Sequence, residues 1–145
     1  MSLSIYFHKE NIQFNIKHKI NIKKWIIYII KKYNHNLGFI NYIFCSDDFL
    51  YDINLNYLKH NTYTDIITFN YNNNKIINSD IYISIERVKY NAHTFNVSYK
   101  SELLRVIIHG VYHLLGYEDH SETEKEKMRS LENYAIDVYK NHKYC

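Results

Sequence analysis

The chain has 145 residues, of which 46% are apolar and 23% are charged, and it carries a net charge of +3 at pH 7. This length predicts a single domain over residues 1–145, and the charge is compatible with RNA binding but weaker than that of dedicated nucleic-acid binders. The longest apolar run, WIIYII, is too short to cross a bilayer, and the start MSLSIYFHKE predicts no secretory signal. Cys45 and Cys145 form no disulfide framework, so we expect a cytoplasmic protein.

The spacing of apolar side chains predicts strands and helices that alternate along the chain. Residues 4–16 alternate loosely between apolar and polar side chains, which indicates a strand or a hairpin. The elements expected after it are a helix over 21–36, a strand over 39–45, a helix over 46–58, strands over 64–71 and 80–85 joined by a polar turn, a helix over 86–96, a helix from Ser98 to Gly116 and a last helix from Ser121. This order predicts an α+β fold with one small mixed β-sheet and helices packed on it.

Residues typical of helix termini mark several of the predicted helix ends. Ser46 is placed to cap the helix that follows it, and Ser121 with Glu124 forms a capping box before the last helix. Asn36 and Gly38 are expected to end the first helix, because both residue types favour helix termini.

The segment HGVYHLLGYEDH, residues 109–120, is the strongest indication of chemistry. His109 and His113 are four residues apart on the predicted helix, so their imidazoles leave the same face and can converge on one ion. Zinc uses such pairs, and a position left to water makes a zinc site catalytic. Gly116 lets the chain reverse and return a third ligand. The alternative is that both histidines are half-buried polar residues of a core helix.

Gly110 bears on the choice between these interpretations. A glycine inside an apolar helix costs about 1 kcal/mol relative to alanine, which indicates that another part of the chain approaches closely there. The same position argues against a metzincin protease, because those enzymes have a glutamate general base directly after the first histidine.

Two segments resemble the YbeY family, the metal-dependent endoribonucleases of bacterial rRNA maturation. HGVYHLLGYEDH resembles the family signature HGxLHLxGYDH, LNYLKHNTYTDIITF resembles LNxxYRxKDxxTDVLSF, and SDIYIS resembles GDIxIS. The resemblance extends from about Asn56 to Glu132 and implies a zinc-dependent, single-strand-specific endoribonuclease acting in 3′-end maturation of 16S rRNA. It implies one Zn²⁺ per chain, with rRNA, the small ribosomal subunit and ribosomal proteins as partners and no membrane.

The third ligand is the first departure from the family pattern. GYEDH is one residue longer than the family's GYDH, and alignment without a gap places Asp119 on the family's third histidine. We therefore predict His109, His113 and Asp119 as zinc ligands, since a carboxylate oxygen is an accepted zinc donor. His120 is the alternative if the loop absorbs the extra residue. In a third interpretation Asp119 only caps the last helix.

The second departure is Leu58, where the resemblance expects an arginine that binds phosphate. Lys59 or His60 could compensate, but neither has the bidentate fork of a guanidinium. We expect lysine and arginine side chains around the cleft to hold the RNA backbone. Two other functions stay open, a non-catalytic ribosome-assembly module with a structural metal, which Leu58 favours, and a metallohydrolase of another substrate. The residues do not identify a general acid or base.

Overall fold

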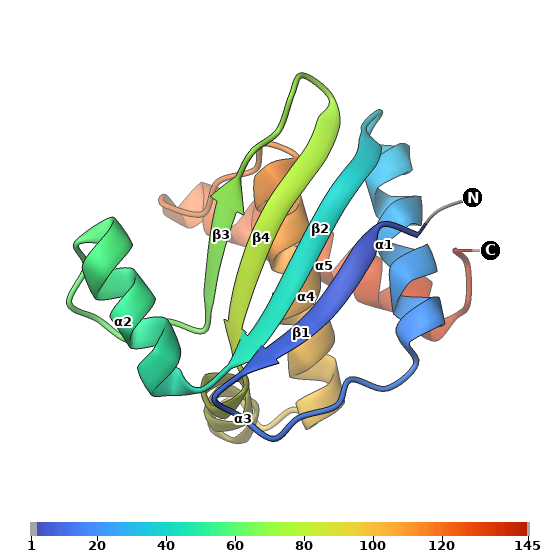
Figure 1. The fold of residues 1–145 in the computed structure, drawn as a ribbon. Helices are drawn as coiled ribbons and strands as arrows, with labels where there is room; N and C mark the ends of the chain where they lie inside the picture. Colours follow the sequence, from blue (N-terminus) through green and yellow to red (C-terminus); the bar gives the residue numbers. More distant parts are fainter. Residues whose placement is uncertain (1–2, 145) are drawn as a thin grey trace.

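The computed structural model describes residues 3–144, and within them four strands form one mixed sheet in the order β1-β2-β4-β3 (Figure 1). The strands are β1 (Ile5–Glu10), β2 (Asn36–Cys45), β3 (Ile66–Asn70) and β4 (Ile76–Ser84). β1 and β4 both run parallel to β2, whereas β3 runs antiparallel to β4. The N-terminal segment therefore forms one strand and not a hairpin.

Five helices within the described residues complete the α+β fold that the sequence predicts. They are α1 (Lys19–Lys32), α2 (Asp47–Leu58), α3 (Ile85–Thr94), α4 (Tyr99–Leu114) and α5 (Glu122–Lys140). Figure 1 shows α1, α4 and α5 together on one face of the sheet, with α2 beside β3. None of the helices in this range is long and apolar enough to span a membrane.

The main core lies between the sheet and the layer of α1, α4 and α5. Its large buried side chains include Trp25 of α1 and Tyr42 of β2, and both polar groups are satisfied. The Trp25 indole donates to the carbonyl of Ala135, 2.7 Å away, and the Tyr42 hydroxyl donates to the carbonyl of Ile107, 3.0 Å away. These bonds connect α1 to α5 and β2 to α4. Separating either pair of elements would leave a buried polar group without a partner, which is costly.

The predicted caps of α2 and α5 are confirmed. Ser46 Oγ accepts from the backbone N–H of Phe49, and Ser121 and Glu124 make both bonds of a capping box. The predicted end of α1 is wrong. The helix ends at Lys32, and the reversal occurs at Asn34, whose φ of 62° is in the left-handed region that asparagine tolerates.

Asn36 and Gly38 belong to β2 instead of to the end of α1. The cause is long-range pairing, since Asn36 lies opposite Ile76 of β4. The same pairing starts β4 four residues before the strand expected from residue 80. Cys45 is buried and makes no disulfide, while Cys145 lies outside the described residues.

Candidate metal centre

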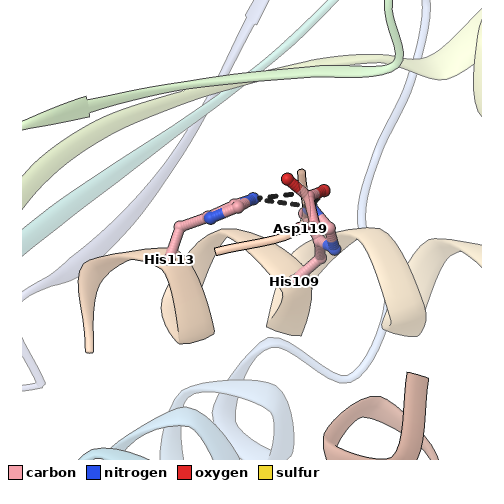
Figure 2. Close-up of side chains that lie close together, drawn as sticks. All are labelled: His109, His113 and Asp119. Atoms are coloured by element: carbon pink, nitrogen blue, oxygen red, sulfur yellow. Dashed lines mark hydrogen bonds and ion pairs between the residues drawn. The ribbon is translucent and has the colours of Figure 1, made fainter. Parts of the chain in front are cut away.

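The histidines of α4 bring two ring nitrogens together, as their spacing predicts. Nε2 of His109 lies 2.9 Å from Nε2 of His113. Oδ2 of Asp119 lies 3.3 Å from the first of these nitrogens and 3.6 Å from the second. Figure 2 shows both rings rising from one helix, with the Asp119 carboxylate beside their nitrogens. These three side chains form a group that could hold one metal ion.

The turn after α4 returns Asp119 to the histidines. Gly116 has a φ of 102°, which an L side chain rarely adopts, and the backbone N–H of Tyr117 donates back to the carbonyl of Tyr112 at 3.1 Å. The carbonyl of Tyr117 lies 2.8 Å from Nδ1 of His113. One short turn therefore positions Asp119 and also fixes the His113 ring.

His120 lies outside this group. Its side chain is 80% exposed, and its Nε2 lies 3.1 Å from Oε2 of Glu118. Its backbone N–H donates to Glu124, within the cap of α5. Ser121 and Glu124 supply that cap, so α5 does not require Asp119 for capping. The structure thus brings together the three predicted ligands and leaves the alternative ligand in solvent.

Both histidines have an acceptor at the nitrogen that faces away from the group. Nδ1 of His109 lies 2.7 Å from Oε2 of the buried Glu132, and Nδ1 of His113 lies against the Tyr117 carbonyl. Each Nδ1 therefore carries the proton in the neutral ring, and the Nε2 lone pairs point at each other and at Asp119. Such a set of electron pairs is repulsive unless a cation or a proton lies between them. The donor set therefore fits a metal ion.

Glu132 contacts the donor group, and the local sequence pattern does not reveal this contact. It belongs to α5, and its second oxygen accepts from Nη1 of Arg105 at 2.9 Å. Burial lowers the pKa of His109, but the hydrogen bond to Glu132 and the charges of Glu132, Asp119 and Asp65 outweigh burial, so the pKa is raised. Glu132 thus stabilises positive charge on the His109 ring.

A cleft of about 640 Å³ opens beside the three donors. His109, His113 and Asp119 line one side, and Leu58 and Tyr63 line it from the segment around the end of α2. Its other polar side chains are mostly uncharged, and none of its described lining residues is lysine or arginine. The cations near the site, Arg105 and Arg129, instead line a second cavity of about 290 Å³.

Asp65 borders both cavities. Burial raises the pKa of its carboxyl, although the charge of His109 opposes the shift. It comes directly before β3 in the segment TDIITF, but its proximity to the histidines depends on the packing of β3 against α4.

The absence of a side chain at Gly110 allows β3 and β4 to pack closely against α4. A Cβ atom at this position would lie 3.1 Å from Cδ1 of both Ile66 and Ile81, and 3.3 Å from Oγ1 of Thr68. These distances are shorter than ordinary contacts, so any side chain at this position would require Ile66, Ile81 and Thr68 to shift, whereas glycine lets β3 and β4 lie directly on the helix. The predicted close approach at Gly110 is confirmed.

The fold and the site define an α+β protein with a group of three donors, placed beside an open cleft, that could hold a metal ion. The chain matches the family described as Endoribonuclease YbeY over residues 5–140. Proteins named Endoribonuclease YbeY from Amoebophilus asiaticus and Cytophaga hutchinsonii are 48% identical over 131 residues and 43% identical over 140 residues. The first alignment covers 90% of this chain and 89% of the relative, and the second covers 94% and 96%.

The fold is also similar to that of a solved structure. The solution structure of TM1509 from Thermotoga maritima superposes with a TM-score of 0.65 at 26% sequence identity, covering 95% of this chain and 94% of that protein. The chain belongs to the YbeY family of endoribonucleases.

Proposed function

We propose that the protein is a zinc-dependent endoribonuclease that cleaves single-stranded RNA during 3′-end maturation of small-subunit 16S rRNA. The observation that carries this proposal is the convergence of Nε2 of His109, Nε2 of His113 and Oδ2 of Asp119 beside an open cleft. Membership of the endoribonuclease YbeY family supports the reaction class. The cytoplasm, where rRNA matures in bacteria, is the proposed location.

Zinc suits this donor set better than the hard cations do. Two imidazole nitrogens and one carboxylate oxygen are typical of catalytic zinc sites, whereas magnesium and calcium favour oxygen ligands. When bound, zinc would supply Lewis-acid chemistry, polarising a phosphate oxygen and making water more acidic. The Nδ1 contacts of the two histidines keep both Nε2 atoms available to it.

The remaining cleft residues would position the RNA. Thr64 and Asn70 line the cleft and offer hydrogen-bonding groups to ribose and phosphate. Because these side chains are uncharged, they would bind the RNA strand by hydrogen bonds and not by attraction to the charge of its phosphates. Ribosomal RNA, the small subunit and its proteins are the partners proposed for this surface.

A second function is a ribosome-assembly module that binds RNA and holds a structural metal. The observation that favours it is that Leu58 lines the cleft, because leucine cannot bind phosphate as the arginine expected from the family pattern would. A metallohydrolase of another substrate is a third possibility for the same donors.

One set of measurements separates these functions. Untagged protein made with supplementary zinc is expected to contain about one zinc per chain by elemental analysis, and less than a tenth of an equivalent would contradict the zinc proposal. The loaded protein is then incubated with a 16S rRNA 3′ fragment. We expect cleavage that a chelator abolishes, that added zinc restores and that His113→Ala lacks. RNA binding and bound zinc without cleavage would support the assembly module.

A further inference from the structure

A column of aromatic and guanidinium groups adjoins the cleft, which one of its members, Tyr63, lines. The rings of Tyr51 and Tyr63 have centroids 4.6 Å apart with an interplanar angle of 31°. Cζ of Arg87 lies 5.3 Å from the centroid of Tyr63 and 5.2 Å from that of Tyr90. Three tyrosines and one arginine, drawn from α2, the loop after it and α3, thus form one continuous group.

The arginine of this column is held by an ion pair. Nη2 of Arg87 lies 2.7 Å from Oδ2 of Asp47, and its Nε lies 3.4 Å from Oδ1. The Asp47 carboxylate also accepts from the Ser84 hydroxyl at 3.0 Å. Because both ends of the pair are anchored, Arg87 is held in place without a ligand, so binding would cost little entropy at this side chain. Asp47 also balances the charge of Arg87, so the column carries little net charge.

Two members of the column are exposed, and one of them, Tyr63, is exposed at the cleft. Tyr63 lines the cleft and is 52% exposed, and Tyr90 is 60% exposed. Leu58, also exposed, lines the same cleft, which has no lysine or arginine among its described lining residues. This wall therefore offers apolar and aromatic surface to a substrate rather than positive charge.

We propose that the column is a subsite for an unpaired RNA base, which packs against the exposed Tyr63 ring while the strand crosses the metal centre. The inference rests on the proposed function and adds how the substrate is held. Aromatic side chains bind the bases of single strands with little sequence preference. A base within a duplex is covered by its neighbours in the stack, so the subsite selects single strands. The affinity it supplies depends less on salt than contacts to phosphate do.

Binding is measured with chelator-treated protein and a fluorescent single-stranded RNA of about ten nucleotides, a length within the range of known single-strand sites. Tyr63→Leu is expected to weaken binding roughly tenfold to hundredfold, because it removes the ring. Tyr63→Phe keeps the ring and is expected to bind like the wild type. Tyr6→Leu is the matched control, since Tyr6 is 48% exposed on β1 and does not line the cleft.

A second measurement uses only wild-type protein, so it is independent of how the variants fold. RNA in which successive bases are replaced by abasic sites is expected to lose as much affinity as Tyr63→Leu does. Equal binding of intact and abasic RNA, or equal binding by Tyr63→Leu and Tyr6→Leu, would overturn the subsite. Absence of RNA binding by the wild type would also overturn it. This experiment measures binding alone, so its result does not depend on cleavage. If the protein binds RNA through Tyr63 but fails to cleave it in the separate cleavage assay, the nuclease proposal is contradicted and the subsite is not.

Discussion

Oε2 of Glu132 lies 2.7 Å from Nδ1 of His109, although the two residues are 23 positions apart and belong to different helices. The other oxygen of this buried carboxylate accepts from Arg105. The His109 ring is thereby fixed in the orientation that points its Nε2 at His113 and Asp119. A carboxylate behind a histidine ligand is a common way to orient the ring and to increase its basicity.

Glu132→Gln is expected to weaken zinc binding about tenfold to hundredfold, because the amide removes the negative charge behind His109. Zinc affinity is measured by competition with a chromophoric chelator. Glu126→Gln, an exposed change on the same helix, serves as the control and should bind zinc like the wild type. Equal affinity in both variants would show that the contact between Glu132 and His109 does not tune the site.

Asp119→Ala is expected to lose zinc affinity much more strongly than His120→Ala. The reason is geometric, since Oδ2 of Asp119 faces both Nε2 atoms while His120 is exposed and pairs with Glu118. The same competition measurement applies to both variants, with their helical circular dichroism as the check on folding. Tight zinc binding that survives in Asp119→Ala and disappears in His120→Ala would reverse the ligand assignment.

Leu58→Arg is expected to preserve the fold and to increase RNA affinity or cleavage. Leu58 lines the cleft and is exposed, so a guanidinium there can reach a phosphate and bind it bidentately. One added phosphate contact should steepen the dependence of log affinity on log salt by about 0.7 for a single strand. If cleavage and the salt dependence both stay as in the wild type, position 58 does not meet the RNA backbone.

Gly110→Val is expected to destabilise the protein by about 1–3 kcal/mol, because the added atoms overpack the contact with Ile66 and Ile81. Gly110→Ala should cost less, since one methyl group meets the far ends of flexible side chains and alanine favours the helix. Urea unfolding followed by circular dichroism gives both free energies. A valine variant as stable as the wild type would mean that β3 and β4 tolerate a wider separation from α4.

The sequence alone determined the features that depend on near neighbours. The pairing of His109 with His113 follows from helical periodicity, the reversal at Gly116 from the conformational freedom of glycine, and the cap at Ser121 from its spacing to Glu124. Each is decided within one or two turns of chain. Because each helix and strand is also recognised from its local pattern, the order of the elements could be read from the sequence, and this order predicted the α+β class.

Only the tertiary structure decided which distant segments meet. Glu132 reaches His109 because α5 packs on α4, and β4 begins at Ile76 because β2 pairs with it. The column at Tyr63 exists because the loop before β3 packs against Arg87 of α3. Such contacts depend on how whole elements fill a shared core, and the local sequence shows which face of an element is buried but not which distant segment it meets.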